Sequence, residues 1–419
     1  MRGFLHLLPS LVLLLTRLLT LVHAQFQEES PPTTTTTTLG FTNASALYVL
    51  GDSTVDCGDN TLFYPLLHAR LSLYPCNGSD SSLLPQLLGF LGEKARSKKP
   101  PFCLLFSIAH LLFDGFTHVL WPLVERCEKM GLPFIRPFYG QNGSLDEVIS
   151  GLNFGSTQAT IMSKDSSSHQ SLSQQLRQVS DTLQLLQLQL TEDIALHFTK
   201  SSIFFLSFGK EDFIDLFLHN FSSQVFDQST AHDFPTMLVN QMTNAMRYLY
   251  DVNARKIICL GILPLGYTPH LAWLCNQTSL LVGGDDDNGE SCVDEANKLV
   301  LEYNNLLYEH ISMLNVEFTD AQIVFCDVYK GMMQIINWPK LYGFEDTRSA
   351  CCGLGLNSAM IGCISLDGAC EEASTHVWWD LFNPTHAVNS ILADAAWSGL
   401  PFSGLCQPIT IHELVSKNF

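Results

Sequence analysis

Gly51-Asp52-Ser53 is the first stretch of the chain whose residue types could do chemistry. It follows the apolar run Ala46–Leu50, which contains an aromatic and a β-branched residue and is typical of a short buried strand. In an open α/β sheet, ligands bind at the carboxyl ends of the strands. Ser53 would expose a hydroxyl there that a neighbouring base could activate as a nucleophile. On its own the tripeptide also fits a polar turn, so the rest of the chain must decide.

A second group of polar residues lies near the C-terminus, within residues 377–386. Asp380, Asn383 and His386 follow one another at intervals of three residues. Pro384 fits the first turn of the helix that we expect to follow. We predict that this stretch forms the other half of the cleft that begins at Ser53.

The elements that must position these residues alternate between strands and helices. Short apolar runs ending in glycine or polar residues predict strands, whereas leucines at helical spacing predict helices. Such alternation indicates a parallel sheet with helices on both faces, so we predict a three-layer α/β/α, flavodoxin-like fold. The helix at 171–190 is expected to lie on the surface and to carry no chemistry. The predicted strands lie around 46–50, 151–157, 203–209, 256–266 and 322–328, and the predicted helices around 171–190, 236–252 and 293–314.

Composition excludes several classes of protein. Lys and Arg total 22 against 41 Asp and Glu, and the net charge of −19 argues against nucleic acid or anionic membrane surfaces as partners. A hydrophobic content of 46% excludes a mainly disordered chain. The 13 cysteines are unusual for a reducing cytosol but ordinary for a secreted protein with disulfides.

The N-terminal region has the pattern of a secretory signal. Residues 1–24 combine Met1-Arg2, a leucine-rich run and a small-residue cleavage pattern at Ala24, and we interpret them as a signal peptide. Arg17 inside the apolar run argues against an integral membrane anchor. Residues 25–44 are predicted to be a flexible Thr-rich leader. We expect a secreted, extracellular protein, including a cell-wall location, and the Asn-x-Ser/Thr glycosylation sites support this at Asn43, Asn77, Asn142, Asn220 and Asn276.

Residues 45–407 are predicted to form a single domain, followed by a C-terminal tail at 408–419. The segment 89–127 is an atypical insertion in that domain. Its apolar run follows a basic cluster, and Asp114 and Pro122 make it a poor transmembrane helix. Removing the segment joins its flanks into one continuous helix-to-strand connection. We hypothesise a translated retained intron or an error of gene prediction, with a true insertion as the alternative.

Several short blocks occur in an order that resembles the plant secreted GDSL esterase/lipases, members of the SGNH hydrolase superfamily. The resemblance covers Ala46 to about Pro401 and implies the three-layer fold and hydrolysis of carboxylic esters, with no cofactor. The blocks that carry it are Gly51-Asp52-Ser53, Asn153-Phe154, Gly209-Lys210-Glu211-Asp212, Leu263-Pro264-Leu265-Gly266, Tyr303-Asn304-Asn305-Leu306-Leu307, Cys351-Cys352-Gly353 and Trp379-Asp380-Leu381-Phe382-Asn383-Pro384-Thr385.

The resemblance assigns the roles of a serine hydrolase to particular residues. Ser53 corresponds to the nucleophile and Asp380 to the acid that orients the base. The family's histidine falls at Asn383, and the asparagine that donates to the oxyanion falls at Glu211. The other oxyanion donors correspond to Ser53 and Thr157, where the second block has lost or displaced its usual glycine.

Both departures weaken this mechanism. The amide of Asn383 is not basic and cannot accept the proton of Ser53. Removing the histidine of a serine protease lowers turnover about 10⁶-fold, which raises the barrier by about 8 kcal/mol. A carboxylate at Glu211 would repel an oxyanion ~4 Å away by about 4 kcal/mol at an effective dielectric constant of about 20. We therefore expect ester hydrolysis to be impaired or lost.

Other residues are candidates to replace the missing base. His386 lies three residues after Asn383, one helical turn further along, and His376 lies four residues before the aspartate of the same block. Either could approach Ser53, although a solvent-facing position is the simpler expectation for His386. Glu211 could also act as a base itself in a rearranged site.

The cysteines near the last block are expected to form disulfides. Cys351 and Cys352 could in principle bind a metal ion, but no His or Cys partner has ligand spacing. With a secretory signal, disulfides are the better interpretation, and Cys363 and Cys370 are expected nearby. Because the side chains of adjacent cysteines diverge, Cys351 and Cys352 should bond to different partners.

Two functions of different classes follow from these observations. The first is a secreted ester hydrolase that works weakly or through a substitute base. The second is a non-catalytic protein that uses the cleft to bind an ester, an acylated carbohydrate or a cell-wall polymer. The substituted positions favour the second. In both, the partner is a small-molecule or polymeric ester, and the sequence predicts neither its acyl chain nor the oligomeric state.

Overall fold

The computed structural model describes residues 44–55, 135–141, 143–156, 158–162, 170–223, 228–282, 291–363 and 369–419. All of them belong to one compact unit, Thr42–Phe419. The expected signal peptide, nearly all of the expected leader and the whole atypical insertion at 89–127 lie outside the described residues, so these assignments stay predictions.

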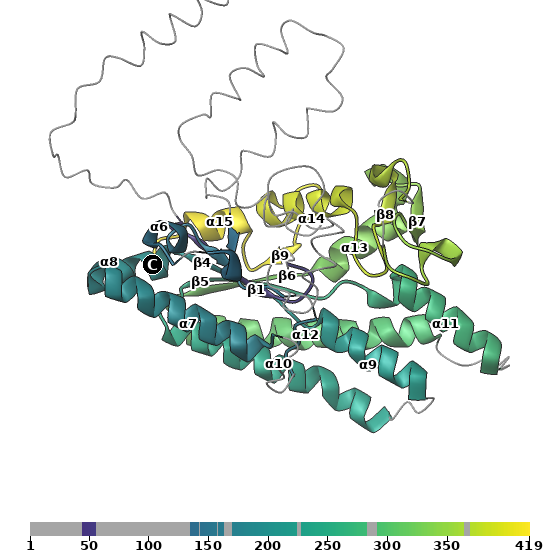
Figure 1. Cartoon of the computed structure of the whole chain (residues 1–419), viewed down its shortest axis with the longest axis horizontal. Coiled ribbons are helices and arrows are strands. Elements are labelled where there is room, and N and C mark those ends of the chain that lie inside the picture. The colour runs from purple at the N-terminus through teal and green to yellow at the C-terminus, as the bar shows by residue number, and fades with distance from the viewer. Residues whose placement is uncertain are drawn as a thin grey trace, which may run out of the picture. The chain divides into compact units, whose positions relative to one another are not determined.

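A seven-stranded sheet forms the centre of this unit (Figure 1). Its strand order is β2-β3-β1-β4-β5-β6-β9, and every neighbouring pair is parallel except β6 and β9. The four five-residue inner strands, β1, β4, β5 and β6, are buried almost throughout, which explains their mainly apolar sequences. The strands are β1 (Leu47–Gly51), β2 (Arg136–Pro137), β3 (Leu152–Asn153), β4 (Ile203–Ser207), β5 (Lys256–Leu260), β6 (Gln322–Cys326) and β9 (Cys406–Gln407).

Helices cover both faces of the sheet and complete three layers, which confirms the predicted fold class. Figure 1 shows α7, α10 and α12 along one face and α14 and α15 along the other. The helices are α6 (Leu145–Val148), α7 (Leu172–Gln189), α8 (Glu192–Ser201), α9 (Lys210–Ser223), α10 (Gln228–Asp251), α11 (Pro269–Val282), α12 (Cys292–Glu317), α13 (Val328–Asn337), α14 (His386–Ser398) and α15 (Ile411–Ser416). Short 3₁₀ helices lie at η1 (Phe138–Gly140), η2 (Leu265–Tyr267), η3 (Pro339–Tyr342), η4 (Leu356–Ser358) and η6 (Ala373–Thr375).

The C-terminal residues fold onto the sheet, whereas we expected a tail after residue 407. Strand β9 pairs antiparallel with β6, next to a disulfide between Cys326 and Cys406. Helix α15 follows, capped by Thr410 and Glu413, which each bond to the other's backbone N–H. Its residues Ile411 and Leu414 are buried. The domain therefore extends through α15, and the capping box Thr-x-x-Glu was the sequence signal for it.

A small parallel sheet, β7 (Asp346–Ala350) with β8 (His376–Trp378), lies outside the main one. Disulfides surround it, and Cys351 and Cys352 bond to different partners, as predicted. The disulfides among the described residues are Cys275–Cys292, Cys326–Cys406, Cys351–Cys370 and Cys352–Cys363, and Cys259 is a buried free thiol.

In the described ranges, no helix is long and apolar enough to cross a membrane. Among the predicted glycosylation sites, Asn276 is exposed on α11 and Asn220 lies in α9. Asn43, Asn77 and Asn142 lie outside the described residues.

Candidate active site

Strand β1 delivers Asp52 and Ser53 to the carboxyl edge of the sheet, as its position between β3 and β4 requires. The last residue of the strand, Gly51, is held by the buried side chain of Gln175 on α7. Gln175 Oε1 accepts from the N–H of Gly51 at 2.8 Å, and its Nε2 donates to the carbonyl of Gly51 at 2.9 Å. A Cβ on Gly51 would lie 2.6 Å from the carbonyl oxygen of Ser207, so only glycine fits between β1 and β4. The turn that carries Ser53 therefore begins from a fixed point.

The buried carboxylate of Asp52 joins this turn to helix α9. Its Oδ1 accepts from the N–H of Thr54 at 2.9 Å, and its Oδ2 accepts from the N–H of Lys210 at 3.1 Å. Lys210 is the first residue of α9, where backbone N–H groups have no helical partner and attract negative charge. Asp52 is thus a structural residue that brings the start of α9 to Ser53.

Ser53 meets Glu211, the second residue of α9. The Ser53 hydroxyl donates a hydrogen bond to Glu211 Oε1, and this is its one side-chain hydrogen bond within the described structure. Burial raises the pKa of Glu211 to about 7, even though part of the residue is exposed. The Lys210 ammonium and the Ser53 hydrogen bond oppose this rise, whereas Asp52 and Asp215 add to it. The sequence comparison placed Glu211 at an oxyanion donor, but in the structure it accepts from Ser53.

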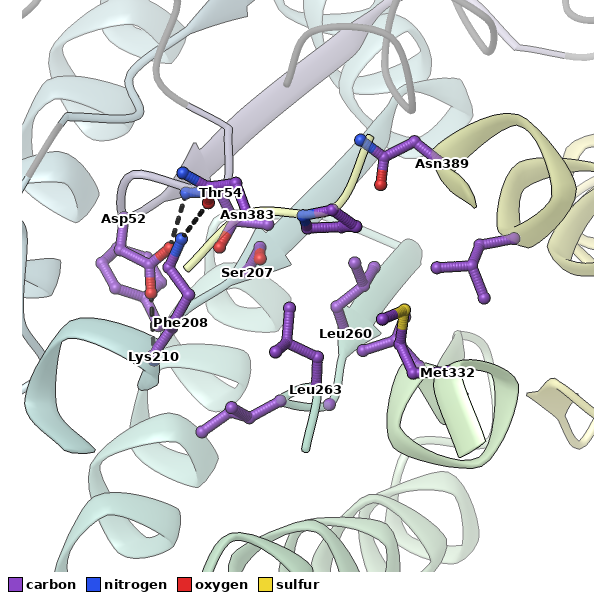
Figure 2. Close-up of a pocket in the computed structure, with 15 residues that line it drawn as sticks. Asp52, Thr54, Ser207, Phe208, Lys210, Leu260, Leu263, Met332, Asn383 and Asn389 are labelled. Carbon is purple, nitrogen blue, oxygen red and sulfur yellow. Dashed lines mark hydrogen bonds between the residues drawn. The ribbon is translucent and has the colours of Figure 1, made fainter. Parts of the chain in front are cut away.

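Lys210 and Asp380 meet at Asn383, the position that the resemblance assigns to the family's histidine. Figure 2 shows Lys210 beside Asn383. Lys210 Nζ donates to Asn383 Oδ1 at 2.8 Å, and Asn383 Nδ2 donates to Asp380 Oδ2 at 3.0 Å. Lys210 and Asn383 are only 4% and 8% exposed. An ammonium group only donates hydrogen bonds and a carboxylate only accepts them. The amide oxygen of Asn383 must therefore face Lys210, and its amide nitrogen must face Asp380. Asp380 Oδ1 also accepts from the N–H groups of Phe382 and Asn383, which fixes the loop before α14.

The histidines considered as substitute bases have other partners. His386 Nδ1 lies 3.2 Å from Ser390 Oγ on its own helix. His376 Nδ1 lies 3.2 Å from both Thr375 Oγ1 and the carbonyl oxygen of Glu372. Since the Ser53 hydroxyl bonds to Glu211, neither histidine accepts from it.

The second block holds the turn after β1. Asn153 Nδ2 donates to the carbonyl of Val55 at 2.7 Å, while its Oδ1 accepts from the N–H of Gly155 at 2.8 Å. The N–H of Ser156 donates to the carbonyl of Gly51 at 3.1 Å. The N–H groups of Gly155 and Ser156 are therefore engaged within the protein. Thr157, the predicted oxyanion donor of this block, lies outside the described residues.

Asp212 bonds to a different segment from the one that carries Ser53. Its carboxylate accepts from the N–H groups of Ile161 and Met162, at 2.9 and 3.1 Å. Burial raises its pKa to about 7, against the effect of these hydrogen bonds. Adjacent acids at the start of α9 thus have separate functions: Glu211 contacts Ser53, and Asp212 anchors the loop.

A pocket opens beside this network, and Figure 2 shows its lining. Both sequence neighbours of Ser53 belong to it, together with Lys210 and Asn383 on the polar side. An apolar wall faces these groups and suits a neutral ligand with a hydrocarbon part. That wall is formed by Phe208, Leu260, Ile262, Leu263, Val328, Met332 and Leu392.

Sequence reasoning missed Lys210 and Gln175 as parts of the site. Lys210 stood in the third block, directly after Gly209 at the end of a buried strand, and a lysine there was the available signal. Gln175 is placed by the capped start of α7, whose Ser171 bonds to the N–H of Gln174. Nothing in the leucine spacing distinguishes a buried Gln175 from the other glutamines of that helix.

Comparison with known proteins places these contacts in a family context. The family model described as GDSL-like Lipase/Acylhydrolase matches residues 47–396. The chain is 28% identical to GDSL esterase/lipase At1g71250 of Arabidopsis thaliana, over 90% of each chain. It is 27% identical to GDSL esterase/lipase At1g71691 of the same plant, over 89% of this chain and 86% of the relative. A third Arabidopsis thaliana protein, GDSL esterase/lipase At5g08460, is 28% identical over 88% of this chain and 87% of its own.

Proposed function

The chain belongs to the GDSL-like lipase/acylhydrolase family, and from that premise we propose that its cleft binds carboxylic esters but hydrolyses them far more slowly than an intact family member. Ser53 is the proposed nucleophile and Asp380 the proposed remnant of the triad. The proposal extends to a secreted protein, because the disulfides fit an oxidising compartment and the N-terminal pattern fits a signal peptide.

The observation that carries the proposal is the hydrogen-bonded chain Lys210–Asn383–Asp380. In a serine hydrolase, the aspartate orients a histidine that accepts the serine proton. Here Asp380 instead orients an amide, and the other end of that amide accepts from an ammonium group. No basic nitrogen stands at this position, which supports a loss of histidine-dependent turnover of about 10⁶-fold.

Glu211 supports the proposal independently. Where the family has an oxyanion donor, this side chain supplies an acceptor that is already bonded to Ser53. Loss of one oxyanion-hole donor lowers turnover about 10²- to 10³-fold. The two substitutions impair different parts of the same reaction. One removes the histidine that accepts the serine proton, and the other removes a donor that stabilises the oxyanion.

A second candidate function is binding without turnover. The pocket beside Ser53 supports it, because its apolar wall and polar edge do not depend on a histidine. Its ligand would be an ester, an acylated carbohydrate or a cell-wall polymer, held with the acyl part against the wall.

Ligand binding by the Ser53→Ala protein tests the shared part of both proposals. We expect calorimetric titration with a p-nitrophenyl ester to give saturable binding. Leu263→Trp, which adds bulk to the buried apolar wall, should weaken it at least about tenfold. Leu188→Trp on the exposed side of α7 is the matched control and should bind like the parent. Equal affinity of the two tryptophan variants would place the ligand elsewhere and reject the cleft as the binding site.

A further inference from the structure

The contact between Ser53 and Glu211 places a carboxylate where a serine hydrolase needs a base. We propose that Glu211 is the general base for Ser53, so that the protein retains a reactive serine although Asn383 replaces the histidine. The inference rests on the proposed ester-binding function and adds a catalytic residue to it. It assigns the Ser53 proton to Glu211 Oε1, the atom to which the hydroxyl already donates.

The fold holds Glu211 in this position through both of its neighbours in the chain. The N–H of Lys210 is bound by Asp52, the residue before Ser53. On the other side, Asp212 is bound to the backbone at Ile161. Because the start of α9 is fixed at these two points, the side chain between them is directed at the serine. A carboxylate pre-positioned in this way needs no rearrangement to accept a proton.

The basicity of Glu211 suits the task. A general base works best when its pKa lies near the operating pH, and an ordinary histidine has a pKa of about 6.5. Burial raises the pKa of Glu211 to about 7, so its basicity is comparable to that of an imidazole. The charged groups that face it are Lys210, which lowers this pKa, and Asp52 and Asp215, which raise it.

The transfer of the acyl group to Ser53 balances with these groups alone, and water then releases the acyl group from the serine. Ser53 Oγ forms a bond to the acyl carbon of the ester, and its proton passes to Glu211 Oε1. The alkoxy group of the ester then takes that proton as its bond to the carbon breaks. Glu211 is neutral while negative charge is on the oxyanion, so the repulsion expected from a carboxylate is absent at that moment. The site still lacks the oxyanion donor that the family has at the position of Glu211, so turnover stays slow.

Lys210 acts as a positioning residue for this pair. Its ammonium favours the ionised form of Glu211 and is itself held by Asn383 Oδ1. The residue at the histidine position would then serve to hold a cation near the new base. Lys210 and the two substituted residues, Glu211 and Asn383, would form one rearranged site.

The test is the rate at which a fluorophosphonate probe labels Ser53 as a function of pH. This probe loses fluoride and needs no proton from the protein, so a single activated serine suffices. We expect labelling of the mature protein to accelerate between about pH 5 and about pH 9, with a midpoint near the pKa of about 7. Glu211→Gln should slow labelling at least about 100-fold, and Ser53→Ala should abolish it. Glu192→Gln, an exposed glutamate on α8, is the matched control and should label normally.

Lys210→Met distinguishes a catalytic Glu211 from a structural one. It removes the charge that lowers the pKa of Glu211, so the pH midpoint of labelling should move upward. An unlabelled mature protein, a pH-independent rate, or normal labelling of Glu211→Gln would overturn the proposal. If Glu211→Gln fails to fold, the Lys210→Met midpoint decides: an upward shift supports the base, and an unchanged midpoint rejects it. An unlabelled protein that still binds ester rejects only this inference. Fast ester turnover that is lost in Glu211→Gln would reject the proposal of impaired hydrolysis but support Glu211 as the base.

Discussion

At the scale of single residues, the site joins a lysine, Lys210, to two substituted positions, Glu211 and Asn383, and their side chains match their partners. The ammonium of Lys210 meets an amide oxygen, the amide nitrogen of Asn383 meets Asp380, and the carboxyl of Glu211 meets Ser53. Each contact pairs a donor with an acceptor, so little of this buried polar network is left unsatisfied. The sequence predicted the substitutions at Glu211 and Asn383 as two defects of the same mechanism, without Lys210. Their coupling depends on a contact between residues 210 and 383, which no local pattern reveals.

Restoring the histidine alone should recover little hydrolysis. In Asn383→His, the imidazole lies beside the Lys210 ammonium, and this like charge disfavours the protonated form that the mechanism requires. Asn383→His with Glu211→Asn should recover more kcat/KM for p-nitrophenyl butyrate than the sum of the single changes. Adding Lys210→Met should recover more again, because the residues act as a unit. A single Asn383→His that matched the triple variant would contradict this coupling.

Glu211 should also make stability depend on pH. Its pKa rises from 4.5 to about 7 on folding, so between these values the folded protein binds more protons than the unfolded chain. The stability of the native protein should therefore fall across this range as pH increases. The Glu211→Gln variant lacks this effect. Between pH 5 and pH 8 its free energy of unfolding should therefore rise by up to about 3 kcal/mol relative to that of the native protein. Thermal unfolding at both pH values measures it, and a difference between the two proteins that is constant with pH would refute it.

At the scale of elements, β1 and α9 supply the site, and α7 supports it. Apolar runs predicted β1, β4, β5 and β6 because buried parallel strands are apolar on both faces. The support from α7 was not predictable, because its glutamines look alike until the helix is placed against Gly51. Helix α15 is too short for a clear apolar periodicity, so its capping box was the one sequence signal for it.

Removing the Gln175 side chain tests this support. Gln175→Ala leaves the N–H and the carbonyl of Gly51 without their partner in a buried position. We expect a loss of at least about 2 kcal/mol in the free energy of unfolding, because each unsatisfied buried group costs about 1–3 kcal/mol. Gln187→Ala on the exposed side of the same helix is the control and should change little. Urea denaturation compares the two, and equal stabilities would show that the clamp contributes nothing.

At the scale of the whole molecule, the described disulfides link segments between residues 275 and 406. The cysteine count and the secretory pattern predicted extensive pairing, and the divergence of adjacent side chains predicted separate partners for Cys351 and Cys352. The pairing of Cys326 with Cys406 was not predictable, because it depends on β9 returning beside β6. Sequence spacing alone does not define a connection that forms across a sheet.

Thiol mapping of the purified protein tests this arrangement. The described disulfides should appear as linked peptides, and Cys259 should react with a maleimide only after denaturation. Cys259 is fully buried, and burial raises its pKa to about 12, so the reactive thiolate is scarce in the folded state. Rapid labelling of Cys259 in the native protein, or free thiols at Cys351 and Cys352, would contradict the structure.

Ester turnover by the purified mature protein tests the central claim most directly. Hydrolysis of p-nitrophenyl butyrate should be compared with an intact family member at equal concentration, with Ser53→Ala defining the background. Asn383 leaves Asp380 without an imidazole, and Glu211 removes an oxyanion donor, so we predict a rate far below that of the intact relative and close to that background. A rate that matches the intact relative and disappears in Ser53→Ala would contradict the account.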